Sequence, residues 1–98
     1  MGTALLRRRP DQVGRVDCLR FEGYVCWFNS NDHPPPHFHV KRTGEWELRV
    51  FFLMEPVRFE TVFSLHRVSS RVLREIVQRV QENRSELLQE WSEKVHHG

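Results

Sequence analysis

The segment Asn31-Asp32-His33-Pro34-Pro35-Pro36-His37-Phe38-His39-Val40 decides how this chain is organised. Its three consecutive prolines fix φ at about −65° and remove three backbone donors, so neither a helix nor a central strand can run through them. We therefore expect a stiff, extended connector that leads into a strand. Because alternate residues of a strand point to opposite faces, Phe38 and Val40 are predicted to face a core. His37 and His39 should then project together from the other, water-facing side.

The residues after this segment predict a β-hairpin with strands over residues 37–41 and 45–52. A loop of residues 42–44, with Gly44 in the left-handed conformation, keeps the apolar side chains of both strands on one face. This register pairs His39 with Glu47 and His37 with Arg49. The polar face of the hairpin would then consist of His37, His39, Lys41, Glu45, Glu47 and Arg49.

The flanking sequence predicts two further strands, over residues 19–28 and 57–63, and a helical C-terminus. Ser69 or Ser70 suits the N-cap of a helix. Asn83 followed by Glu86 resembles a capping box that would begin a second helix, although one long kinked helix is an alternative. The expected fold is α+β, a four-stranded antiparallel sheet packed by a C-terminal helix or helix pair. Residues 1–18 are expected to form a flexible or loosely docked arm, and residues 19–98 a single domain.

The composition is that of a soluble globular protein, with 39% hydrophobic and 29% charged residues. No apolar run approaches the roughly 20 residues needed to span a bilayer, and no signal peptide is recognisable, so we expect a cytoplasmic protein without membrane contact. Two cysteines are too few for a disulfide scaffold and are expected to be free. The net charge of +2 falls short of a basic nucleic-acid stripe.

The histidine- and proline-rich segment also resembles the hallmark of a small bacterial family known as domain of unknown function 4160. That family carries an N-D-H-x-P-P-H-F-H segment after an aromatic strand and a closing E-L-L-x-x-W, to which Glu86-Leu87-Leu88-Gln89-Glu90-Trp91 is similar. The resemblance covers residues 20–92. The arm of residues 1–18 is extra, and residues 59–67 look longer than the usual entry to the helix.

Members of this family are often associated with toxin–antitoxin-like gene pairs. The resemblance therefore implies one component of a two-gene module that acts by binding a small protein partner encoded nearby. In that interpretation, His33, His37 and His39 simply satisfy loop backbone and strand glutamates. The polar face of the hairpin then serves as a protein-binding surface.

A divalent-metal site is one chemical alternative for the same residues. A His-x-His pair on a strand places two imidazoles on one side, and the connector can return Asp32 or His33 as a third ligand. Imidazole and carboxylate together suit zinc or another divalent metal. Glu47 would act as a ligand, or as the acceptor for the other ring nitrogen of His39.

Metal-independent cleavage of RNA is the second chemical alternative. A histidine titrates near neutral pH, so His37 and His39 can serve as general base and acid. Arg49 would hold the phosphate and stabilise its developing charge. The sequence itself fixes neither a substrate nor whether any reaction is catalysed.

Overall fold

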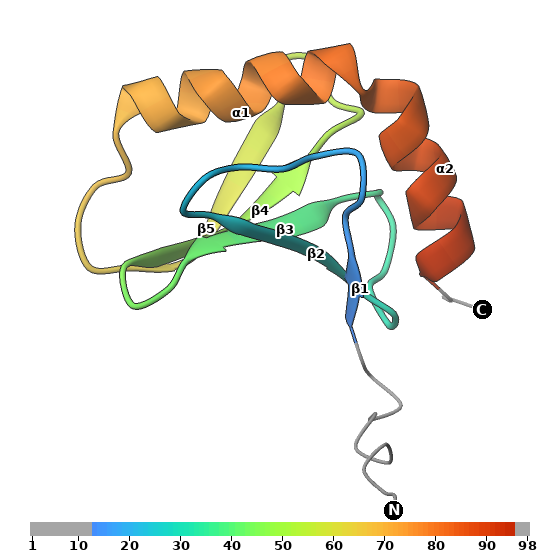
Figure 1. The fold of residues 1–98 in the computed structure, drawn as a ribbon, viewed down its shortest axis with the longest axis horizontal. Helices are drawn as coiled ribbons and strands as arrows, with labels where there is room; N and C mark the ends of the chain where they lie inside the picture. The colour runs from blue at the N-terminus through green and yellow to red at the C-terminus, as the bar shows by residue number, and fades with distance from the viewer. Residues whose placement is uncertain (1–12, 96–98) are drawn as a thin grey trace, which may run out of the picture.

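The chain folds into an antiparallel sheet followed by two helices (Figure 1), in a computed structural model that describes residues 13–95. The strands follow one another in the order of the sequence: β1 Val13–Arg15, β2 Val25–Asn29, β3 Phe38–Arg42, β4 Trp46–Phe51 and β5 Arg58–Ser64. The helices are α1 Ser70–Glu82 and α2 Arg84–Lys94. The predicted α+β class with an antiparallel sheet is thus confirmed.

The sheet has five strands, so the prediction of four was wrong. The additional strand, β1, pairs Arg15 with Trp27 and lies within the segment expected to be an arm. It has only three residues, too few to show the alternation by which strands are recognised in a sequence. Val16, which follows it, is only 1% exposed. Residues 1–12 of the predicted arm lie outside the described residues.

The hairpin of β3 and β4 differs in register from the prediction. His39 pairs with Arg49 rather than Glu47, and Lys41 pairs with Glu47. The loop therefore comprises residues 43–45, and Gly44 within it has φ +79°. A shift of two residues leaves every side chain on its predicted face, so the hydrophobic pattern cannot distinguish the two registers.

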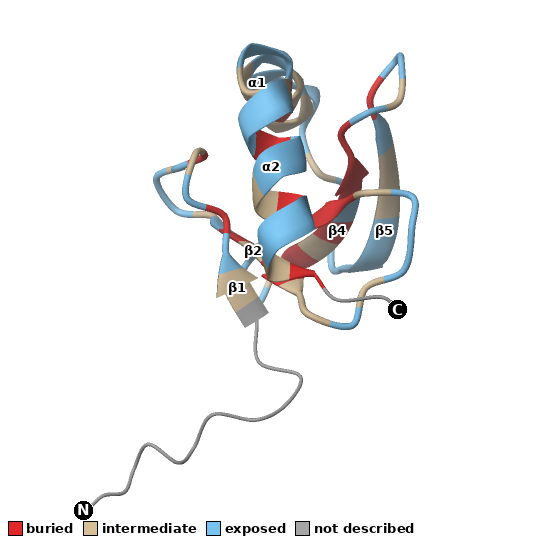
Figure 2. Cartoon of the chain, turned by 90° about the vertical axis from the view of Figure 1, so that its right-hand side faces the viewer, coloured by how far each residue is buried: buried red, intermediate tan, exposed pale blue. Residues whose placement is uncertain are grey.

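The two faces of the sheet are occupied differently. The inner face packs against the helices, and its buried residues join Ile76 and Val80 of α1 and Leu87 and Trp91 of α2 in one core. The strand residues of this inner set are Cys26, Phe28, Phe38, Val40, Trp46, Leu48 and Val50. The outer face, defined here by Trp27, His39, Lys41, Glu47 and Arg49, looks away from this core. Buried residues accordingly gather where α2 faces the strands (Figure 2).

The C-terminus contains two helices rather than one kinked helix, and they meet at Asn83. Ser69 caps α1, because its hydroxyl accepts the backbone N–H of Val72. Asn83 does not form the predicted capping box: its side chain donates instead to the carbonyl of Arg79, 2.8 Å away. Within the described part of the chain, neither helix is long and apolar enough to cross a membrane.

Candidate functional site

The connector between β2 and β3 bends at Pro34 and Pro35, so it is not extended throughout as predicted. The bend turns the chain back toward Asp32, which lies just beyond the end of β2. Asn29 holds it there, because the backbone N–H of Asp32 donates to the Asn29 carbonyl and the backbone N–H of Asn29 donates to Oδ2 of Asp32, both at 3.1 Å. The sequence from Asn29 to Asp32 thus forms a closed turn that positions one carboxylate.

Both predicted histidines meet this carboxylate. Nε2 of His39 lies 2.9 Å from Oδ2 of Asp32, and Nε2 of His37 lies 3.5 Å from the same oxygen. One ligand atom from each residue falls within 4.8 Å of the other two. We call Asp32, His37 and His39 the histidine cluster.

The histidine cluster is buried, so the prediction of water-facing imidazoles was wrong. His37 is 6% exposed and His39 only 4%. The ring of His39 stacks on Trp27 with centroids 5.2 Å apart, while the ring of His37 contacts Phe51 and Trp91 at 5.0 and 5.6 Å. These aromatic residues come from β2, β4 and α2, and they exclude water from the two imidazole rings that the alternation pattern assigns to solvent.

Burial and hydrogen bonding together set the charge of the cluster. Burial raises the pKa of Asp32, but the hydrogen bonds from His37 and His39 outweigh it and hold that pKa well below its usual range. Burial likewise lowers the pKa of His37, but the Asp32 carboxylate and the Pro35 carbonyl outweigh it, so the pKa of His37 is raised above its ordinary value. The metal-free cluster therefore contains an Asp32–His37 ion pair at mildly acidic pH.

The second ring nitrogen of His37 fixes its orientation. Nδ1 lies 3.0 Å from the carbonyl oxygen of Pro35, which can only accept, so Nδ1 carries a hydrogen. In the neutral ring the lone pair is consequently on Nε2, the atom that faces Asp32. This arrangement, with one nitrogen bonded to a backbone carbonyl and the other aimed at the site, is the usual one for metal-ligating histidines.

Nε2 of His39 has two neighbours with opposite requirements. It lies 2.9 Å from Oδ2 of Asp32, which needs a hydrogen, and 3.1 Å from Nδ2 of Asn29, which needs a lone pair. The Asn29 amide cannot turn round at no cost, because its Oδ1 accepts the indole N–H of Trp27 at 3.0 Å. Among the described residues, Nδ1 of His39 has no hydrogen-bond partner, and the nearest carboxylate, that of Glu47, is 3.9 Å away.

A divalent ion fits this donor set. An ion at about 2.0–2.1 Å from each donor places donors about 3.3 Å apart in a tetrahedron, close to the 2.9 and 3.5 Å measured from Asp32 to the two imidazoles. The ion would take the lone pairs of both Nε2 atoms together with Oδ2. Nδ1 of His39 would then carry the hydrogen and point it toward Glu47. The Asn29 amide would have to give up its contact with Nε2.

The other predicted site residues lie around the histidine cluster rather than in it. His33 is exposed, and its ring is not part of the convergent set. Glu47 approaches the far nitrogen of His39, as an outer acceptor would. Arg49 opposes His39 on the neighbouring strand, and its Nη1 lies 3.5 Å from Oε1 of Glu60. The sequence did not predict a role at the site for Asn29, Pro35 or Glu60, which bind Asp32, His37 and Arg49 respectively.

A cleft of about 290 Å³ opens beside the cluster. Asp32 and His37 line one part of it, Arg49 and Glu60 another, and Pro34, Pro35 and Phe51 provide apolar walls. The cleft gives a molecule in solution a route to the carboxylate and to one imidazole. A bound ion would therefore keep an accessible side.

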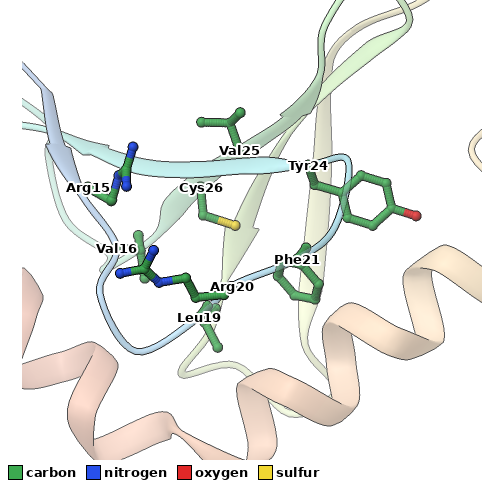
Figure 3. A pocket seen from close by; sticks show the side chains of 8 residues that line it. All are labelled: Arg15, Val16, Leu19, Arg20, Phe21, Tyr24, Val25 and Cys26. Carbon is green, nitrogen blue, oxygen red and sulfur yellow. The ribbon is translucent and has the colours of Figure 1, made fainter.

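A second hollow, of about 200 Å³, lies at the edge of β2 beside the loop of residues 16–24 (Figure 3). Its walls include the aromatic rings of Phe21 and Tyr24 and the buried Cys26. Cys18 and Cys26 are both free, as predicted, and burial raises the pKa of each thiol to about 12. Such thiols are protonated at neutral pH and are poor nucleophiles. This hollow is therefore a poor candidate for catalysis.

Comparison with protein families matches residues 23–92 to the family described as "Domain of unknown function (DUF4160)". The match covers more than half of the chain, so the chain belongs to this family. It includes the histidine cluster, the hairpin and most of α2. Comparison with the curated proteins and with the solved structures found no match.

Proposed function

We propose that this domain binds one divalent transition-metal ion, with zinc as the first candidate, through Asp32, His37 and His39. The observation that carries the proposal is the convergence of three ligand atoms within 4.8 Å. Two imidazoles and a carboxylate are a common ligand set for zinc and for iron(II). Three protein ligands leave a further position open, which is typical of catalytic rather than structural sites.

The hydrogen bonds around the cluster support the same proposal. A single hydrogen on Nε2 of His39 cannot satisfy Asp32 and Asn29 at once, and Nδ1 of that ring is left without a partner among residues 13–95. Unsatisfied buried polar atoms are costly, by about 1–3 kcal/mol each. An ion on Nε2 removes the conflict with Asp32 and turns Nδ1 into a donor that faces Glu47.

Metal titration of chelator-treated protein tests the proposal. We expect one equivalent of zinc to bind in calorimetry and to raise the melting temperature, since a ligand that binds the native state more tightly than the unfolded chain stabilises the native state. His39→Ala should weaken binding by about 100-fold or more, because a ligand contributes more than the 10- to 100-fold of an outer partner. Less than about 0.1 equivalent bound, with no thermal shift, would exclude the site.

His33→Ala is the matched control for this titration. His33 lies in the same segment, but its ring is exposed and outside the cluster. We expect its zinc affinity to stay within about twofold of wild type, because no ligand or outer partner is removed. Equal losses in His33→Ala and His39→Ala would point to loose binding by the histidine-rich segment. Circular dichroism on both variants separates loss of the ligand from loss of the fold.

A role in a bacterial two-gene module, of the toxin–antitoxin-like kind, is a second candidate. The exposed apolar side chains near the end of β5 support it: Val62 is 44% exposed, Phe63 41% and Leu65 70%. β5 is an edge strand, and exposed apolar edges favour pairing with another chain. A stable complex after co-expression with the product of the adjacent gene would support this role. Free, non-interacting proteins in that experiment would argue against it.

Metal-independent RNA cleavage by His37 and His39 has less support. Both rings are nearly inaccessible, so His39 in particular cannot reach a large substrate without movement of Trp27 or Asn29. Cleavage of RNA by chelator-treated protein would favour this alternative. Cleavage that needs added metal would instead assign the activity to the ion-loaded site.

A further inference from the structure

We propose that the cleft beside the histidine cluster binds an organic phosphate, with one phosphate oxygen directed to the bound ion and two to the guanidinium of Arg49. This inference rests on the proposed function, because the ion supplies part of the charge that attracts the phosphate. The site would thus recognise organic phosphates, and Arg49 would determine its specificity for phosphate over other anions.

Arg49 is available for a ligand in this structure. Its side chain is 45% exposed, and its ion pair with Glu60 is long, at 3.5 Å, with Glu60 itself 39% exposed. Ion pairs of this kind contribute little to stability, so an anion can displace Glu60 with small loss. Glu60 also contacts Arg58, at 3.3 Å, and keeps that partner when Arg49 turns toward the cleft.

The charges of the ion-loaded cleft favour an anion. Its lining contains the carboxylates of Asp32 and Glu60, the guanidinium of Arg49 and the imidazoles of His33 and His37. A divalent ion on Asp32 raises the positive charges to three against two negative ones. Without the ion, the cleft lacks this excess of positive charge and attracts a dianion less strongly. Binding of the phosphate should therefore depend on the ion.

The geometry of oxygen atoms distinguishes phosphate from carboxylate. A guanidinium offers a planar fork of N–H groups that donates to two oxygens side by side. A carboxylate that fills this fork must bind the ion through one of the same two oxygens, whereas a phosphate monoester has a third terminal oxygen for the ion. Phosphate also carries about −1.5 to −2 charges at pH 7, against one for a carboxylate.

The apolar walls of the cleft favour an organic ester over inorganic phosphate. The rings of Pro34, Pro35 and Phe51 line the cleft together with Arg49, and the volume of about 290 Å³ leaves room beyond a phosphate group. Pockets for small organic molecules usually combine such walls with a few placed polar groups. The ester group would lie against Phe51 and the two prolines.

Calorimetry with phenyl phosphate, benzoate and inorganic phosphate tests the inference on the zinc-loaded protein. Zinc binding is measured first, so that failure of the ion site is distinguished from failure of the phosphate site. We expect phenyl phosphate to bind more tightly than either other probe, and to lose its binding in chelator. A protein that binds zinc but not phenyl phosphate, or that prefers benzoate, would overturn the inference.

Three variants assign the recognition to Arg49. Arg49→Gln should weaken phenyl phosphate binding by about 10- to 100-fold, the usual worth of a charge-assisted contact. Glu60→Gln should strengthen it, because a competing carboxylate is removed. Arg74→Gln, which removes an exposed arginine of α1 outside the cleft, should leave it within about twofold. If Arg49→Gln and Arg74→Gln lowered the affinity for phenyl phosphate to a similar extent, the effect would come from net charge alone and would contradict the proposal.

Discussion

Two charged clusters hold this domain together, and they differ in how well their partners are matched. The histidine cluster joins the turn after β2 to the start of β3. A second group, here called the lysine cluster, consists of Asp17, Glu90 and Lys94 and joins the segment after β1 to α2. Both bring together a carboxylate, a cationic group and backbone N–H groups.

Every polar atom that the lysine cluster brings together has a suitable partner. Nζ of Lys94 donates to the Arg15 carbonyl at 2.6 Å and to Asp17 and Glu90 at 2.9 Å. Glu90 also accepts the backbone N–H groups of Asp17 and Cys18, at 2.7 and 2.9 Å. The three ammonium hydrogens of Lys94 thus have three acceptors, and the cluster is partly open to water.

The histidine cluster is more buried and less well matched. One oxygen of Asp32 faces two imidazoles and a backbone N–H, while a ring nitrogen of His39 has no hydrogen-bond partner in the described structure. A network whose donors and acceptors are all paired can be understood as a stabilising feature of the fold, whereas a buried network with an unpaired polar atom suggests a missing ligand. The following variants test this difference between the two clusters.

Removing the central carboxylate of each cluster should give the largest effect and the largest contrast. Asp32→Ala leaves two buried imidazoles without their acceptor, so we expect a loss of about 2–4 kcal/mol in the free energy of unfolding and loss of zinc binding. Glu90→Ala should cost about 1 kcal/mol, because water can reach its donors, and should leave zinc affinity unchanged. Denaturant unfolding and calorimetry measure both quantities. A zinc affinity lowered equally by both variants would contradict the distinction.

The pH dependence should give the next largest effect. The pKa of His37 is raised in the folded state, so its ion pair with Asp32 stabilises the metal-free protein below about pH 6.5 and is lost as the pH rises through the folded pKa. Asp32, with its lowered pKa, loses its contribution only as the pH falls below about 4. Zinc needs the neutral imidazole, so its affinity should rise with pH over the range in which metal-free stability falls.

The lysine cluster is the internal control for this experiment. The pKa of Glu90 is lowered, because hydrogen bonds from Asp17, Lys94 and Cys18 outweigh burial, and the pKa of Lys94 is raised by its two carboxylates against burial. Its contribution should therefore be constant from about pH 5 to 10 and be lost only outside that range. Melting temperatures measured from pH 5.5 to 8.5, with and without zinc, provide the test. Curves with and without zinc that stay parallel would contradict the assignment of His37.

Lys94→Met should give the smallest effect on stability. Methionine keeps the Cβ and Cγ methylenes that lie beside Gly14, and the lost ion pairs are partly exposed, so we expect a loss of at most about 1 kcal/mol. The change should appear locally, as faster hydrogen exchange of the Val16 amide, which donates to the Cys26 carbonyl where β1 meets β2. Zinc affinity within about twofold of wild type is expected, since the histidine cluster is untouched. A large fall in zinc affinity would show that the two clusters are coupled and would contradict the conclusion that only the histidine cluster binds the ion.

The sequence predicted that His37 and His39 lie together with Asp32 or His33 nearby, but it predicted neither the choice between those two residues nor the surroundings of the imidazoles. Asp32, His37 and His39 lie in one segment, so local geometry suffices to bring them together. Their burial depends on Trp27, Phe51 and Trp91, which come from three separate elements and whose contacts no local pattern reveals. The face that alternation assigned to water is closed by these rings.

The hairpin register and the position of Phe63 were also not predicted, and each has a physical reason. The hairpin register depends on whether Glu45 belongs to the loop or the strand, and both choices keep the same faces inside. An irregularity between β4 and β5 brings Phe63 opposite Glu47 on the outer face, where it is 41% exposed, although alternation placed it with Phe59. Such irregularities insert a residue without a clear sequence signal.

The short span of the histidine cluster has a kinetic consequence. All three donors lie within residues 32–39, and closing so short a loop costs little entropy. An ion can therefore be captured before α2 docks and Trp91 covers His37, while the chain is still largely unfolded. Such early capture would stabilise the native state by less than the measured affinity suggests, because the unfolded chain is also bound. The gain would appear instead as faster refolding in the presence of the metal.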